Sequence, residues 1–285
     1  MKNGRGLRTG KEMKMKFTYR NVQIDLEREE ENLQDKLKQA EMKNEAVMCK
    51  QNEYEYVYQF SGNRGNIVRW LNLPKECKLL ELGASTGGLT RCLTAQFQDV
   101  TAAETDVELL LQNVTKQHLN GFRAYGGSYD TLLASLEEGS FDCIIMNEMN
   151  LEFEKQKKLM PAVYGLLREQ GILLYGVDNK YAPISWWRED IPLECMATGQ
   201  QSLQALKSVG FRRIEEYFPV PNGTITMELY EKEYLNRHGV DAGMYQLYYN
   251  EFQLEHIKNI TKEAKRDGVL SEYMTTFLYV AKKGE

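Results

Sequence analysis

The chain has 285 residues, of which 42% are hydrophobic and 27% charged, and its formal net charge is −5. This length allows one large hydrophobic core with appended segments. The acidic balance argues against a nucleic-acid-binding body, and no apolar run reaches the roughly 18 residues that a membrane span requires. We therefore expect a cytoplasmic protein with no membrane span and no nucleic-acid partner.

The five cysteines, at positions 49, 77, 92, 143 and 195, are scattered and form no C-x-x-C pair. Such a set argues against a disulfide framework and against a zinc site. Since no other metal-ligand spacing stands out, no metal site is predicted.

The N-terminal quarter divides into two segments. The first 20 residues hold seven Lys or Arg against one Glu, so residues 1–24 are predicted as a basic flexible tail. Residues 25–53 are predicted as a helix. It carries an apolar repeat with four- and three-residue steps, made by Leu33, Leu37, Ala40, Asn44 and Val47. A repeat this short fits a helix packed on the body and a homodimer contact equally well.

Seven strand-like stretches follow Tyr54, and helix-like runs separate the first five of them. The strands are expected at Lys78–Leu82, Val100–Glu104, Phe122–Tyr125, Phe141–Met146, Gly171–Val177, Arg212–Phe218 and Thr275–Ala281. The helices between them are expected at Gly88–Gln96, Val107–Lys116, Thr131–Leu136 and Lys155–Arg168. This alternation predicts an α/β fold with a doubly wound, mostly parallel seven-stranded sheet. The core spans 54–218, a helical cap is inserted at 219–272, and 273–285 supply the last strand.

The segment from Lys78 to Glu104 is the most informative part of the chain. An apolar strand runs into a turn of small residues at 83–88, and a helix and a second strand follow. The second strand ends in Glu104, about 20 residues beyond Gly83. In a parallel βαβ unit that acid lies beside the turn, where it can accept hydrogen bonds from a ribose. The segment predicts a nucleoside-bearing cofactor.

The spacing of the turn separates two classes of cofactor. A dinucleotide fingerprint needs G-x-G-x-x-G, whereas here Ser85 takes the middle position between Gly83 and Gly87, and Glu81 precedes them. This E-x-G-x-(G/S)-x-G arrangement resembles motif I of class I S-adenosylmethionine-dependent methyltransferases. The resemblance implies a Rossmann-like fold with an antiparallel last strand, S-adenosylmethionine as cofactor and S-adenosylhomocysteine as product.

The same resemblance implies which residues meet the cofactor. The turn would hold its aminoacyl end, Glu104 its ribose, the end of the third strand its adenine, and Asn147 would lie near the sulfonium. The predicted cofactor-binding residues are Arg64, Glu81, Gly83, Ala84, Ser85, Gly87, Glu104, Thr105, Ser128, Tyr129 and Asn147.

The acceptor site is expected at the ends of the fourth and fifth strands and in the cap. Asp178, Asn179 and Lys180 end the fifth strand, and a Trp pair follows at 186 and 187. Polar groups beside stacking surface suit a substrate pocket. If the acceptor is a hydroxyl, a base is needed. The candidate catalytic residues are Asp178, Asn179, Glu148 and His238.

Several short segments resemble a narrower group, the methyltransferases encoded with bacterial surface-polysaccharide synthesis (rhamnan-synthesis-like). These are Phe60–Ile67, Asp178–Lys180, Gly210–Phe211, Tyr217–Pro221, Glu233–Leu235 and Phe277–Lys283. The resemblance implies transfer of a methyl group to a small-molecule or glycan-type acceptor, at a hydroxyl. Three alternatives stay open from the sequence: a nicotinamide-dependent sugar-modifying oxidoreductase, a nucleic-acid methyltransferase and a non-catalytic cofactor-binding relative. The absence of a basic face and of an N-P-P-Y or Pro-Cys target-base motif disfavours the nucleic-acid methyltransferase. Glu81 and the glycine spacing disfavour the oxidoreductase.

Overall fold

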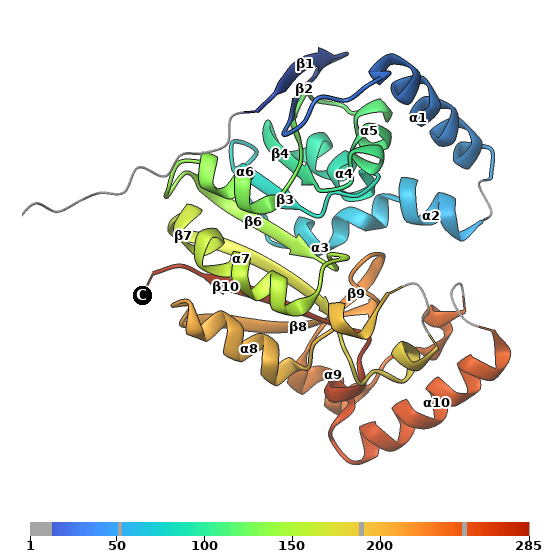
Figure 1. Cartoon of the computed structure of the whole chain (residues 1–285). Coiled ribbons are helices and arrows are strands. Elements are labelled where there is room, and N and C mark those ends of the chain that lie inside the picture. The colour runs from blue at the N-terminus through green and yellow to red at the C-terminus, as the bar shows by residue number, and fades with distance from the viewer. Residues whose placement is uncertain (1–12, 51–52, 188–190, 247–249, 285) are drawn as a thin grey trace, which may run out of the picture.

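One ten-stranded sheet runs through the part of the chain that the computed structural model describes, residues 13–50, 53–187, 191–246 and 250–284. Its strand order is β1-β2-β5-β4-β3-β6-β7-β10-β8-β9 (Figure 1). The strands are β1 (Met15–Tyr19), β2 (Val22–Leu26), β3 (Lys78–Leu82), β4 (Asp99–Glu104), β5 (Arg123–Gly126), β6 (Phe141–Asn147), β7 (Leu167–Asp178), β8 (Arg213–Pro221), β9 (Thr226–Glu231) and β10 (Thr276–Lys282). Seven of these strands match the predicted strands. The other three, β1, β2 and β9, were not predicted and make the sheet larger.

The strands at the centre of the sheet are parallel. β3 pairs in parallel with β4 and β6, and the parallel pairing continues through β5 to β2 on one side and to β7 on the other. β10 lies antiparallel between β7 and β8. The carboxyl ends of β3, β4 and β6 therefore meet at one edge, which is where ligands bind in open α/β sheets.

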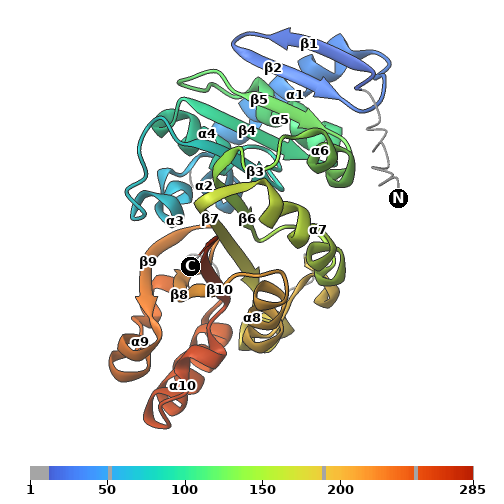
Figure 2. The ribbon, with the colours of Figure 1, turned by 90° about the vertical axis from the view of Figure 1, so that its left-hand side faces the viewer.

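Successive residues of the central strands face two separate hydrophobic cores, because side chains alternate along a strand. Leu80 and Leu82 of β3 join the core that lies under α6, α7 and α8, whereas Leu79 joins the core under α3, α4 and α5. Figure 2 shows α7 and α8 on one side of the sheet and α3 and α4 on the other. The helices are α1 (Leu33–Met48), α2 (Tyr54–Phe60), α3 (Asn66–Arg69), α4 (Gly88–Gln96), α5 (Val107–Thr115), α6 (Tyr129–Ser135), α7 (Phe153–Leu166), α8 (Gly199–Ser208), α9 (Lys232–His238) and α10 (Glu251–Arg266).

The prediction of a basic flexible tail at residues 1–24 is wrong for the second half of that range. Residues 15–26 form the antiparallel hairpin of β1 and β2, and β2 extends the parallel sheet beyond β5. Val22, Ile24 and Leu26 alternate with polar residues, and all three are fully buried. The positive charge of this segment concealed a period-two pattern that predicts a half-buried strand. Residues 1–12 lie outside the described part.

The predicted N-terminal helix is α1, which is shorter than the range 25–53 at both ends. Its repeat packs within the chain, since Leu37 and Ala40 are buried against Leu111 of α5, and Asn44 and Val47 are also buried. This packing within the chain agrees with the packed-helix interpretation. The homodimer stays a prediction.

The predicted cap at 219–272 begins later than expected. Residues 219–231 belong to the sheet, where the end of β8 pairs with β9. The helical part follows as α9 and α10, and α9 packs against β8 and β9 (Figure 1). These helices lie beside the edge of the sheet. Tyr248 and Tyr249 of this segment lie outside the described residues.

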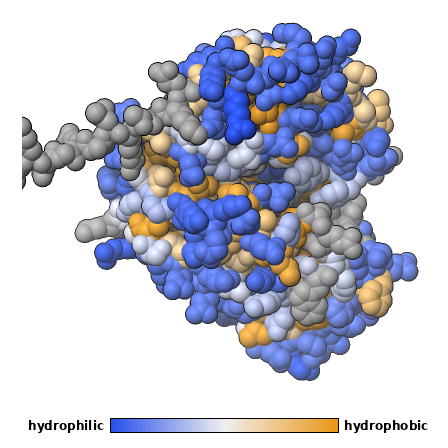
Figure 3. All heavy atoms as spheres, viewed as in Figure 1, coloured by the Kyte–Doolittle hydropathy of each residue, from blue (hydrophilic) through white to orange (hydrophobic). Residues whose placement is uncertain are grey.

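The surface seen in Figure 3 is predominantly hydrophilic, with scattered apolar patches. Among the described helices, none has both the length and the apolar character that crossing a bilayer requires.

Replacing Ile24 in β2 by Ala tests whether the hairpin belongs to the core. Ile24 is fully buried, so Ile24→Ala should lower the free energy of unfolding by about 2–5 kcal/mol in urea titrations. The neighbouring Gln23→Ala is the control, because Gln23 is exposed and its loss should cost under about 0.5 kcal/mol. Equal midpoints for both variants would restore the flexible-tail interpretation.

Candidate active site

The glycine turn is fixed to the neighbouring strand by its backbone. The N–H groups of Gly83 and Ala84 both donate to the carbonyl oxygen of Ala103, each at 3.0 Å. Gly83 and Gly87 have φ of 80° and 85°, which glycine adopts without strain. A Cβ on Gly83 would lie 2.9 Å from Met149, and one on Gly87 would overlap the side chain of Asn113. Only a residue without a side chain fits at either position.

Glu104 points back at this turn from the end of β4. One carboxylate oxygen accepts a hydrogen bond from the N–H of Ser85 at 2.9 Å. The other accepts from the N–H groups of Thr105 and Asp106, at 2.7 and 3.1 Å. Glu104 is 7% exposed, and that exposed part opens into a cavity. The predicted convergence of acid and turn is present in the structure.

A cavity of about 680 Å³ lies at this edge of the sheet. Its lining residues come from α2 and the turn that follows it, from the segments after β3, β4, β5 and β6, from position 191, and from the connection between β8 and β9. They are Tyr54, Glu55, Tyr58, Arg64, Gly83, Ser85, Glu104, Thr105, Asp106, Leu109, Tyr129, Asn147, Glu148, Asn150, Leu151, Ile191, Asn222 and Thr224. Cavities of this size enclose ligands as large as a nucleoside cofactor together with a small acceptor.

Eight predicted site residues line the cavity: Arg64, Gly83, Ser85, Glu104, Thr105, Tyr129, Asn147 and Glu148. Arg64 donates to the carbonyl oxygen of Thr224 at 3.1 Å, and its guanidinium lies 4.7 Å from the centre of the Tyr58 ring. Asn147 donates to the carbonyl oxygen of Gly223 at 3.0 Å. Both residues therefore hold the connection between β8 and β9 against the cavity.

Glu148 is anchored by three donors. Its carboxylate accepts hydrogen bonds from the N–H of Gly223 at 2.8 Å and from the hydroxyls of Thr276, at 2.7 Å, and Thr224. Its φ of 45° lies in the left-handed region, which is unfavourable for a residue with a side chain. Strained residues of this kind often lie at functional sites.

Three of the four predicted catalytic residues lie elsewhere. Asn179 is 1% exposed and donates to the carbonyl oxygens of Glu272 and Met274, at 2.8 and 2.9 Å, so it joins chain segments. Asp178 is buried beside Thr276 and does not line the cavity. His238 is exposed on α9, where its ring lies 4.3 Å from that of Tyr234. All four candidates are in the described part of the chain, and Glu148 is the one that reaches the cavity.

The other four predicted cofactor residues, Glu81, Ala84, Gly87 and Ser128, do not line the cavity. Ala84 is buried, and Gly87 packs on Asn113. Ser128 caps α6, and its N–H donates to Glu27 at 2.7 Å. Glu81 is 3% exposed and accepts a hydrogen bond from the hydroxyl of Thr90 at 2.7 Å. Burial raises the pKa of Glu81 to about 7.

Sequence analysis missed the contributions of α2 and of the connection at 222–224. Tyr54 and Tyr58 are four residues apart, which places them on one face of a helix. Their alternation with Tyr56 and Phe60 obscured that spacing. Asn222 and Thr224 were assigned to the cap, and nothing local places them at the cavity.

Comparison with known proteins agrees with this geometry. Residues 80–175 match the family model of a methyltransferase domain. A S-adenosylmethionine-dependent methyltransferase from Archaeoglobus fulgidus has a similar fold, with 16% identity, a TM-score of 0.53, and coverage of 77% of this chain and 92% of that one. A Mesorhizobium loti S-adenosylmethionine-dependent methyltransferase aligns at 15% identity and a TM-score of 0.50, covering 78% of this chain and 98% of that one. No protein of curated function matches the sequence significantly.

A third similar structure is phosphoethanolamine N-methyltransferase 2 of Haemonchus contortus, in complex with S-adenosyl-L-methionine. It is 17% identical, with a TM-score of 0.53, and the alignment covers 81% of this chain but 56% of that one. At such identities the likeness concerns the fold. The domain match over residues 80–175 and the shared fold support methyltransferase activity for this chain. It is an S-adenosylmethionine-dependent enzyme, and the oxidoreductase alternative gains no support.

Replacing Glu81 by Gln should change how stability depends on pH. The pKa of Glu81 is raised from 4.5 to about 7 in the folded state, so between these values the folded protein keeps a proton that the unfolded chain has lost. The free energy of unfolding therefore falls as pH rises through this window. Glu81→Gln keeps the acceptor for Thr90 and should be more stable than wild type above pH 7, by about 1–3 kcal/mol. Urea titrations at pH 4, 6 and 8 measure this difference, and parallel pH profiles would contradict it.

Proposed function

We propose that the enzyme transfers a methyl group from S-adenosylmethionine to a hydroxyl of a small-molecule or glycan-type acceptor. One observation carries this proposal: the glycine turn, Glu104 and Glu148 open into the same cavity. The cofactor supplies an electrophilic methyl group. The protein has to align the acceptor with that carbon and exclude water.

The cavity has two chemically different ends. The turn at Gly83 and Ser85, together with Glu104, suits the aminoacyl group and the ribose. Leu109 and Tyr129 offer apolar and aromatic surface for the adenine. Gly83 lines the cavity without a side chain, which supports a close approach of the cofactor to the backbone of the turn.

The other end would hold the acceptor, and its lining is polar and mostly uncharged or acidic. Asn150, Asn222 and Thr224 offer amides and a hydroxyl, and Tyr54 and Tyr58 offer rings. Among the lining residues that the structure describes, Arg64 is the single cation, against four carboxylates, Glu55, Glu104, Asp106 and Glu148. This balance favours a neutral, hydroxyl-rich acceptor over a phosphate or carboxylate. The resemblance of Phe60–Ile67 to glycan-modifying methyltransferases agrees with this choice.

The acceptor class is tested by product formation. Release of S-adenosylhomocysteine should be faster with neutral pyranosides than with the same sugars carrying a phosphate. Faster turnover of the phosphorylated series would contradict the proposed acceptor.

Replacing Glu104 by Ala should weaken binding of S-adenosylhomocysteine about 10- to 100-fold, because charge-assisted hydrogen bonds to the ribose are lost. Asp99→Ala is the matched control. Asp99 begins the same strand, and its carboxylate pairs with exposed Arg123 at 2.8 Å. Calorimetry on both variants measures the effect. An unchanged affinity for Glu104→Ala would mean that the ribose lies elsewhere.

We propose Glu148 as the base that accepts the proton of the acceptor hydroxyl. A carboxylate has about four acceptor positions, and three donors hold Glu148 in place, which leaves one for substrate. Glu148→Gln should lower kcat about 10²- to 10⁴-fold, with little change in cofactor affinity.

Thr276→Val is the control for this test, because it removes one anchoring hydrogen bond and keeps the carboxylate. We expect its kcat to stay within about tenfold of wild type, the factor for a loss of about 1.4 kcal/mol. If Glu148→Gln lost no more turnover than Thr276→Val, Glu148 would be an anchor for the connection at 222–224 and not the base.

A further inference from the structure

Lys116, the first residue after α5, carries a buried ammonium group. Lys116 is 3% exposed. Its Nζ donates to Asn44 Oδ1 at 3.0 Å, to Gln59 Oε1 at 2.9 Å and to the carbonyl oxygen of Thr86 at 2.5 Å. An ammonium has three donors, so all of them are used, and all three acceptors are neutral. Burial lowers the pKa of Lys116 to about 7.

These three acceptors belong to three separate parts of the fold. Asn44 lies on α1, Gln59 on α2, and Thr86 in the glycine turn. Thr86 directly follows Ser85, and Gln59 directly follows Tyr58, both of which line the cavity. One buried charge therefore connects the glycine turn with α2, and both of these segments contribute residues to the cavity lining.

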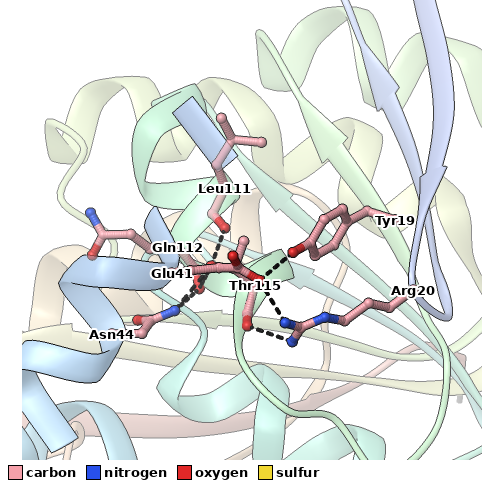
Figure 4. A network of polar contacts seen from close by, with 7 residues as sticks. All are labelled: Tyr19, Arg20, Glu41, Asn44, Leu111, Gln112 and Thr115. Carbon is pink, nitrogen blue, oxygen red and sulfur yellow. Dashed lines mark hydrogen bonds and ion pairs between the residues drawn. The ribbon is translucent and has the colours of Figure 1, made fainter. Parts of the chain in front are cut away.

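The α1 end of this connection is itself fixed. Figure 4 shows Asn44 between α1 and the end of α5, where its amide donates to the carbonyl oxygen of Gln112 at 2.8 Å and to the hydroxyl of Thr115 at 3.0 Å. Arg20, in the turn of the β1–β2 hairpin, donates to Glu41 of α1 at 2.6 Å and to the carbonyl oxygen of Thr115 at 3.0 Å. The end of α5, from which Lys116 projects, is therefore held in place by hydrogen bonds from Asn44 and Arg20.

At the α2 end of this connection, two cations contact Phe60, the last residue of the helix. The ring of Phe60 lies 5.1 Å from the Lys116 Nζ and 6.0 Å from the Arg91 guanidinium. Arg91 also donates to the carbonyl oxygen of Phe60. Such contacts each contribute modestly to stability. The contacts of Lys116 also connect α2 with the glycine turn, because its Nζ donates both to Gln59 and to the carbonyl oxygen of Thr86.

We propose that Lys116 is a positioning residue that couples α2 to the glycine turn, so that cofactor binding and the docking of α2 favour each other. If α2 undocks, a buried ammonium loses an acceptor, which is unfavourable. A ligand that orders the turn holds Lys116 in place and with it Gln59. By linkage, docked α2 strengthens cofactor binding by the same factor. This inference rests on the cofactor placement proposed above.

Hydrogen exchange of α2, with and without S-adenosylhomocysteine, tests the coupling. The relevant amides are those of Val57 and Ser61, which close the helix. In wild type the ligand should slow their exchange about tenfold. In Lys116→Met their exchange should be faster and insensitive to ligand, and calorimetry should show about tenfold weaker binding.

Lys43→Met is the matched control, because Lys43 lies on α1, is half exposed and pairs with Glu108 of α5 at 3.5 Å. It should behave as wild type in both measurements. If Lys116→Met folds and the ligand still slows α2 exchange as in wild type, the coupling does not exist. Affinity within twofold of wild type would also overturn it.

Gln59 provides a second pair of variants in case Lys116→Met does not fold. Gln59→Leu removes the acceptor and should lose the coupling, whereas Gln59→Glu keeps an acceptor oxygen and should retain it. Equal behaviour of these two variants would contradict the proposal. Failure of the wild-type protein to bind S-adenosylhomocysteine would overturn the cofactor placement itself, and would appear before any variant is compared.

Discussion

The hydrogen bond from the Ser85 N–H to the Glu104 carboxylate is the contact on which the site depends. It joins the turn after β3 to the end of β4, two segments that the parallel pairing already brings side by side. The bond fixes where the carboxylate lies and holds Ser85 at a φ of 48°, which a residue with a side chain rarely adopts. Because Glu104 has further acceptor capacity, it can stabilise the turn and still face a ligand. The end of the cavity that is proposed to hold the cofactor is thereby formed by contacts within the chain.

Around this fixed end, the rest of the cavity is assembled from distant parts of the chain. α2 contributes from the N-terminal part of the chain, and Arg64 and Glu148 hold the connection between β8 and β9 at the cavity. Both additions rely on buried charged groups that hold backbone atoms. Buried charges of this kind are weak evidence for stability, since removing them from water is costly. Their value here is in fixing positions, which is what a methyl transfer in line with the sulfonium requires.

The sequence predicts features that depend on neighbouring residues, and it does not predict contacts between segments that are far apart in the chain. The βαβ unit from Lys78 to Glu104 was predicted with its acid and its turn, because those features follow from adjacent residues. The hairpin of β1 and β2 was missed, because its lysines and arginines outweighed the alternation of Val22, Ile24 and Leu26. Asp178 and Asn179 were placed in the substrate site because they end a strand. The amide of Asn179 is instead used by backbone atoms at 272 and 274, which lie far along the chain. No local pattern carries that information.

The position of β10 has a consequence for the order of assembly. This strand lies between β7 and β8, and its first residue, Thr276, donates to the carboxylate of Glu148. During synthesis, the glycine turn and β4 leave the ribosome long before β10 does. A nascent chain can therefore complete the glycine turn and the end of β4 while the carboxylate that follows β6 still lacks one of its three anchoring donors, Thr276. Methyl transfer competence would arise last, when the final strand enters a gap in a sheet that is otherwise formed.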